Sequence, residues 1–203
     1  MNNRFDSFWF PGRLILILML SVIGITLQGQ TLMFDVYKDT VKLGYFKAVR
    51  EVNDESEKIV VTRYYESVEQ GRLSTEEWVS KSTYMDGALQ ESLVTLQIGN
   101  QEQIWHATYP TENGNRFEYS PYSKHNYFTK PLYGDDLLYF EEPVKIRKVY
   151  SLFNGELRKL SKKDQTYTFK VFGQKRHYHY ESGVLTHITY NNTNIIVTRR
   201  SEE

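Results

Sequence analysis

The feature that most constrains the fold is a repeated alternation of apolar and polar residues, broken at short intervals by turn-forming residues. Tyr167, Phe169 and Val171 give the clearest example, because each is followed or preceded by a polar neighbour. This two-residue period is typical of a strand with one buried face. Asp86-Gly87 and Asn154-Gly155 separate such runs, and these dipeptides favour tight hairpins. The chain is therefore predicted to be all-β and antiparallel.

About ten strands are predicted, joined by short turns into a single domain that spans residues 31–203, and their spacing is typical of a sandwich or barrel. The runs that support them are Leu32–Tyr37, Val41–Val52, Lys58–Val68, Glu77–Met85, Ala88–Ile98, Gln101–Thr108, Ile146–Phe153, Thr166–Val171, Lys175–Tyr180, Val184–Tyr190 and Asn194–Arg199.

The segment 109–145 differs from the rest of the domain because it holds Pro110, Pro121, Pro131 and Pro143. Proline cannot donate a hydrogen bond to a sheet, so this segment is predicted to form loops and edge strands. Within it, residues 135–140 (DDLLYF) are expected to be extended. The alternative is a one-turn helix capped by the first aspartate.

The first thirty residues are interpreted as a signal peptide. Arg4 and Arg13 precede the uncharged apolar run Leu14–Leu27, which is too short for the roughly 20 residues that span a bilayer. Cleavage is expected beside Gly29 or Gln30. An uncleaved membrane anchor and a buried core helix are the alternatives. The protein is thus expected in the periplasm or outside the cell.

Composition excludes several classes of protein. The chain has no cysteine, which excludes a lipoprotein anchor, disulfides and thiolate chemistry. Lys plus Arg and Asp plus Glu balance at 25 each, whereas a nucleic-acid binder normally carries a basic excess. We therefore expect no nucleic-acid partner, and contact with the membrane only through the signal segment.

Motifs of catalysis are missing from the sequence. It contains no Gly-x-Gly phosphate loop, no Gly-x-Ser-x-Gly nucleophile elbow and no His-Glu-x-x-His pair. Adjacent carboxylates such as Asp135-Asp136 would point to opposite faces of a strand. We therefore expect no enzyme and no cofactor. A hydrolase with carboxylates from different strands stays open as a weaker alternative.

Three histidines give one candidate metal site. If a three-residue loop at 181–183 closes a hairpin, His177 lies opposite His187, and His179 shares their face. Three imidazoles within reach of one another can bind a transition metal. The more ordinary interpretation is the solvent face of a hairpin.

The chain is rich in aromatic residues, with 16 tyrosines, 11 phenylalanines and 3 tryptophans. Most suit half-buried positions in a sheet. Those in the proline-rich segment are less easily explained as strand core, and they form the candidate ligand-binding surface. Its members are Tyr119, Tyr122, Tyr127, Phe128, Tyr133, Tyr139 and Phe140.

Several segments resemble an exported Gram-negative β-rich family of unknown function. They are the first two strands of the domain (FDVYKDTVKLGYFKAVR, 34–50) and LLYFEEP (137–143), VYSLFNGEL (149–157), TYTF (166–169), HYHYESGVL (177–185) and IIVTRR (195–200). The family is similar in architecture to periplasmic lipoprotein-carrier proteins, whose open barrels hold acyl chains on a concave face. The resemblance implies a strongly curved sheet or open barrel, and a hydrophobic ligand. It provides no ligand residue.

Non-catalytic binding of a hydrophobic ligand or a lipid-like partner in the bacterial envelope is the expected function. The alternative is an envelope scaffold that binds another envelope protein and no small ligand. A metal- or carboxylate-dependent hydrolase is less favoured than either.

Overall fold

A computed structural model describes residues 28–69, 72–99, 101–110, 116–119, 127–128, 132–191 and 193–201. Over these residues the chain forms fifteen strands and one short 3-10 helix, η1. The expected all-β class is therefore confirmed. Strand β1 begins at Gln28, and the rest of the predicted signal peptide lies outside the described residues. The described part of the chain holds no helix that is long and apolar enough to cross a membrane.

The strands vary from two to fourteen residues in length. Their bounds are β1 Gln28–Lys38, β2 Val41–Val52, β3 Glu57–Glu69, β4 Arg72–Met85, β5 Ala88–Ile98, β6 Gln101–Pro110, β7 Arg116–Tyr119, β8 Tyr127–Phe128, β9 Lys148–Ser151, β10 Glu156–Lys159, β11 Ser161–Lys163, β12 Thr166–Val171, β13 Gln174–Glu181, β14 Val184–Tyr190 and β15 Ile195–Arg199; η1 is Leu137–Tyr139.

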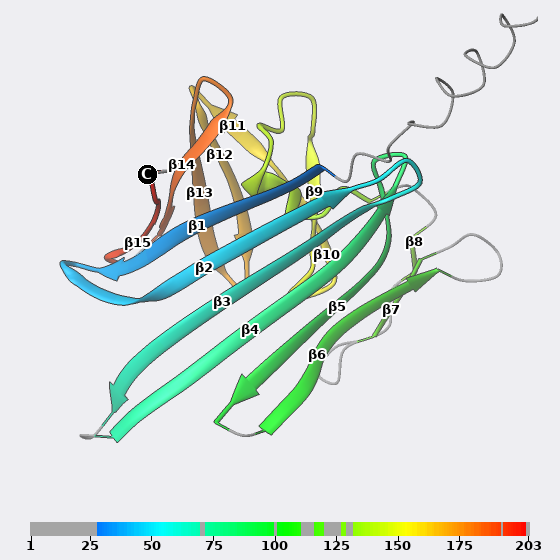
Figure 1. The fold of residues 1–203 in the computed structure, drawn as a ribbon. Coiled ribbons are helices and arrows are strands. Elements are labelled where there is room, and N and C mark those ends of the chain that lie inside the picture. The colour runs from blue at the N-terminus through cyan, green and yellow to red at the C-terminus, as the bar shows by residue number, and fades with distance from the viewer. Residues whose placement is uncertain are drawn as a thin grey trace, which may run out of the picture.

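Thirteen strands form one antiparallel sheet in the order β11-β12-β13-β14-β15-β1-β2-β3-β4-β5-β6-β7-β8. The first and last parts of the described chain meet where β1 pairs with β15, with Val36 opposite Val197. In the described residues β8 and β11 end this order without pairing to each other, so the sheet is not closed into a barrel. Figure 1 shows β11–β14 rising behind the broad surface of β1–β6.

The expected number of strands, about ten, is too low. Strands β7, β8, β10 and β11 have two to four residues each, which is too short to show an alternating pattern. The tight turns were predicted in part: Asn154-Gly155 does not form a two-residue hairpin but belongs to the four-residue loop between Ser151 and Glu156. Asp86 and Gly87 both have positive φ, 50° and 71°, and they join β4 to β5 as a two-residue hairpin.

Residues 132–160, here called the plug, leave the sheet between β8 and β11 and pack against its inner face. The plug contains η1 and the two-stranded β9–β10 sheet. These lie between the two parts of the main sheet, the broad surface of β1–β6 and the strands β11–β14 behind it (Figure 1). Leu138, Val149 and Tyr150 have no exposed surface, and they join one continuous core with inner-face residues such as Phe34 and Phe46. The inner face is therefore largely filled by the protein's own chain.

The extended conformation expected for residues 135–140 is wrong. Leu137–Tyr139 form η1, and Asp136, rather than the first aspartate, caps it by accepting the Leu137 N–H at 3.1 Å. The Tyr180 hydroxyl donates to the carbonyl oxygen of Leu138 at 2.5 Å. This segment turns inward because its three apolar side chains are buried and the sheet supplies polar partners for it.

Candidate functional site

The aromatic residues of the predicted ligand surface are only partly described. Residue 122 and the side chains of residues 119 and 127 lie outside the described part of the structure. Tyr139 is buried in the plug at 2 % exposure. Phe128, Tyr133 and Phe140 are half-buried and pack against the core. The described members therefore serve mainly to seat the plug against the sheet.

The histidine register predicted from the sequence is wrong. The turn is the two-residue Ser182-Gly183, and a bulge follows between His179 and Tyr180. As a result His179, rather than His177, lies opposite His187. The rings of His179 and His187 stack with centroids 4.1 Å apart and planes at 9°.

The histidine rings are held by threonines rather than arranged around an ion. His179 has Nδ1 3.1 Å from the Thr166 hydroxyl and Nε2 3.1 Å from the Thr189 hydroxyl, so both ring nitrogens are engaged. Burial and the neighbouring His187 lower the pKa of His179. Across the described residues, no three His, Cys, Asp or Glu side chains are arranged to hold a metal ion. The predicted histidine triad is thus not assembled.

The adjacent aspartates of the plug are both buried, at 1 % exposure each. Asp136 accepts hydrogen bonds from the hydroxyl groups of Ser82 and Tyr84 on β4. Burial raises the pKa of Asp136 to about 6, although these two hydrogen bonds act in the opposite direction. Because both carboxylates are enclosed between the plug and the sheet, they are placed to hold the plug rather than to meet a substrate.

A cavity of about 340 Å³ lies where β3 and β4 face β13–β15 across the inner side of the sheet. We call it the arginine groove. Its lining residues come from both parts of the sheet and from the plug: Arg63, Tyr65, Glu76, Trp78, Phe153, Phe172, Gln174, Arg176, Tyr190 and Ile195.

Strand alternation explains why these side chains share the groove. Ile59, Val61 and Arg63 lie two residues apart on β3 and are all buried on the inner face. On β13, Arg176 stands in the same relation to the buried Tyr178. Both arginines therefore occupy positions where the pattern of each strand otherwise places apolar or aromatic side chains.

Arg63 is almost fully enclosed, at 4 % exposure. Its guanidinium carbon lies 4.2 Å from the ring centroid of Phe153, and its Nη2 donates to the Tyr139 hydroxyl at 3.2 Å. Arg176 approaches the same Phe153 ring at 5.5 Å and the Tyr190 ring at 5.7 Å. The two cations are thus held mainly by aromatic faces, an arrangement suited to weakly hydrated guanidinium groups.

Asp135 is the buried carboxylate whose charge reaches both arginines. Its Oδ1 accepts the Leu152 N–H at 3.2 Å, and its Oδ2 is buried without a hydrogen bond. Burial raises the pKa of Asp135, and the charges of Arg63 and Arg176 partly oppose that shift. One aspartate therefore offsets the charge of two arginines at the base of the groove.

Phe172 stands at the mouth of the groove in a strained conformation. It belongs to the β12–β13 turn, has φ 48° and is 60 % exposed. A bulky side chain in this region of the backbone is unusual.

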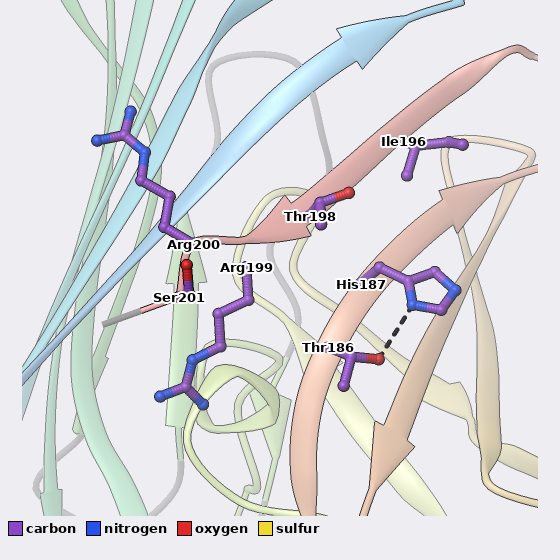
Figure 2. Close-up of a pocket in the computed structure, with 7 residues that line it drawn as sticks. All are labelled: Thr186, His187, Ile196, Thr198, Arg199, Arg200 and Ser201. Atoms are coloured by element: carbon purple, nitrogen blue, oxygen red, sulfur yellow. Dashed lines mark hydrogen bonds between the residues drawn. The ribbon is translucent and has the colours of Figure 1, made fainter. Parts of the chain in front are cut away.

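A second depression, of about 690 Å³, lies beside β14 and β15 and is more open to solvent than the arginine groove. Figure 2 draws the residues that line it. Arg199 and Arg200 point their guanidinium groups in opposite directions there, and the Thr186 hydroxyl lies 3.0 Å from Nδ1 of His187. Arg200 is already paired with Asp35, with Nη2 at 2.6 Å and Nε at 3.0 Å from Oδ1. The arginine groove is the more enclosed of the two, and it combines two arginines with aromatic side chains.

Sequence reasoning missed both arginines of the groove. The signal that was available was a charged residue on the apolar side of an alternating strand, as at Arg63 and Arg176. Pairing the two across the sheet required the topology, because they lie on strands far apart in the sequence. No family model matches the chain, and neither a curated protein nor a solved structure matches it.

Proposed function

We propose that this chain is a non-catalytic protein of the bacterial envelope that binds a hydrophobic or amphiphilic ligand in the arginine groove. The observation that carries the proposal is an aromatic-walled cavity on the inner face of an open curved sheet, at a place that the plug leaves free. Trp78, Phe153 and Tyr190 supply apolar surface, and arginines supply polar groups. Such a combination is typical of small-molecule sites.

The volume of the groove limits the ligand. Ligand pockets commonly measure roughly 300–1,000 Å³, and a cavity of about 340 Å³ lies at the lower end of that range. The rest of the inner face is occupied by the plug, including Leu138 and Tyr150, which have no exposed surface. The groove therefore suits one small ligand, or one end of a longer ligand, rather than several acyl chains bound together.

Export of the protein is a separate part of the proposal. It rests on the apolar run Leu14–Leu27 with arginines before it. Fractionation of cells that express the full chain, followed by N-terminal sequencing, tests it. A mature N-terminus near residue 30 in the periplasm or medium supports export. Recovery from the cytoplasm with Met1 intact contradicts it.

The scaffold alternative has weaker support. Val68 and Leu73 lie opposite each other near the end of the β3–β4 hairpin and are 72 % and 67 % exposed. This pair is smaller than the patches of several hundred Å² that mark interaction sites. The sheet edge at β11 is three residues long and carries Lys162 and Lys163, features that discourage pairing with another strand.

Native mass spectrometry provides the direct test. The protein is purified from an envelope fraction without detergent, and its mass is compared before and after denaturation. A released small molecule with an apolar part supports the proposal and identifies the ligand class. A clean apo mass that is unchanged after incubation with fatty acids, fatty alcohols and lysophospholipids overturns it.

A further inference from the structure

The guanidinium groups of Arg63 and Arg176 approach the same aromatic ring. Both guanidinium groups approach Phe153, at 4.2 Å for Arg63 and 5.5 Å for Arg176. The charge of Arg176 acts on Arg63, and like charges in an enclosed site repel each other because the interior screens them less than water does. The fold therefore concentrates positive charge at the base of the groove.

The protein satisfies these cations only in part. Nη2 of Arg63 donates to the Tyr139 hydroxyl, while its Nε and Nη1 are buried without a partner. Nε of Arg176 is likewise buried without a partner. Among the described residues no carboxylate forms an ion pair with either guanidinium. Buried charges are normally paired or hydrogen-bonded, so these N–H groups need an explanation.

From these contacts we infer that Arg63 and Arg176 bind the anionic head group, a carboxylate or phosphate, of an amphiphile whose apolar part lies against Trp78 and Phe172. An arginine presents its N–H groups as a planar fork that matches both of these oxyanions. The unpartnered N–H groups provide the donors, and the aromatic walls provide the apolar contact. The inference rests on the proposed function and specifies the chemistry of its ligand.

Neighbouring carboxylates set the selectivity of the site. Asp135 offsets part of the positive charge, and Glu76, which lines the groove, accepts the indole N–H of Trp78. Asp135 and Glu76 offset the charge of the arginines without accepting a hydrogen bond from them, so the head group has to supply the acceptors for the unpartnered N–H groups. An uncharged analogue of the same length would leave the buried N–H groups without partners.

The test compares three probes of equal chain length: laurate, dodecyl phosphate and dodecanol. Binding to the protein purified from envelopes, after removal of any bound ligand, is measured by titration calorimetry. We expect laurate or dodecyl phosphate to bind at least about tenfold more tightly than dodecanol, as hydrogen bonds to a charged group imply. The tighter of the two anions identifies the head group.

Substitutions test whether the two arginines, rather than other residues, bind the anion. In Arg63→Met and Arg176→Met, affinity for the preferred anion should fall at least about tenfold, while affinity for dodecanol is unchanged. Thermal stability is measured for both variants, because each change also removes a positive charge that acts on the buried Asp135. Arg200→Gln, on the outer side of the sheet, is the matched control and should leave anion binding unchanged. If a substitution unfolds the protein, Arg63→Lys is the second variant. It keeps the positive charge but lacks the planar set of N–H donors, so it should also bind the anion more weakly.

The outcomes distinguish the inference from the proposed function. Equal binding of laurate, dodecyl phosphate and dodecanol, insensitive to Arg63→Met and Arg176→Met, overturns the inference and leaves the proposed function standing. Failure of all three to bind, with lysophospholipids also failing, overturns the proposed function itself. Loss of anion binding in Arg200→Gln but not in Arg63→Met would place the anion outside the groove and overturns the inference.

Discussion

The hydroxyl group of Tyr84, on the inner face of β4, donates a hydrogen bond to the carboxylate of Asp136 in the plug. Ser82 donates to the other oxygen of the same carboxylate. A single buried side chain therefore links the plug to the centre of the sheet. Because that side chain is an acid with a shifted pKa, the link is expected to depend on pH.

Stability should change with pH through Asp136. Burial raises its pKa from 3.8 to about 6, so the folded state binds the proton more strongly than the unfolded state does. The resulting stabilisation is complete below pH 3.8 and is lost as the pH rises through about 6. For this shift the loss is on the order of 3 kcal/mol. Chemical denaturation of the wild type and Asp136→Asn at several pH values measures it.

The wild type has to be compared with Asp136→Asn because the titration of His106 changes stability with pH in the opposite direction. Burial lowers the pKa of His106 to about 4, so its contribution to stability increases as the pH rises from 4 towards 6.5. We expect Asp136→Asn to gain stability relative to the wild type as the pH rises from 4 to 8. A constant difference between the two proteins over that range would show that Asp136 does not titrate in the folded state.

Replacing Gly44 on β2 by a larger residue is predicted to destabilise the protein for a steric reason. A Cβ at this position would overlap the carbonyl oxygen of Tyr64 in β3, which is backbone and cannot move aside without disturbing the ladder. We expect Gly44→Ala to lower the free energy of unfolding by about 1–3 kcal/mol, as overpacked sites do. Val41→Ala, on the same strand, is the control, since that side chain is 62 % exposed. Equal denaturation midpoints for both variants would refute the steric explanation.

Phe172 should be replaceable with a gain in stability. Its φ of 48° costs an ordinary residue roughly 1–2 kcal/mol, whereas asparagine tolerates this region well. Since the side chain is 60 % exposed, its loss sacrifices little burial. Phe172→Asn should raise the free energy of unfolding by about 1 kcal/mol, and Phe172→Leu should not. A less stable Phe172→Asn protein would show that the ring packs more strongly than its exposure indicates.

How much of this fold the sequence predicts depends on the range of the interactions. Alternation within one strand and turn chemistry within four residues are local, so the long strands and the Asp86-Gly87 turn were predictable. The bulge beside His179 shifts the pairing of β13 with β14 by one residue, and no residue type in that hairpin predicts a bulge there. The plug is held by contacts such as Tyr84 with Asp136 and Thr108 with Tyr150, whose hydroxyls lie 2.6 Å apart. These partners are 52 and 42 residues apart in the chain, so patterns within one strand or turn cannot predict the contacts between them.

The final prediction concerns whether the plug is part of the core or a removable cover. Leu138 has no exposed surface, and its carbonyl oxygen accepts the Tyr180 hydroxyl. If the plug is core, Leu138→Ala leaves a cavity and lowers the free energy of unfolding by about 2–5 kcal/mol. Val144→Ala, in the same segment but at a site 64 % exposed, should change it by less than about 0.5 kcal/mol. Denaturant titrations compare the two. A small effect of Leu138→Ala would mean that the plug detaches before the sheet unfolds, and the inner face would then offer a far larger ligand space than the arginine groove.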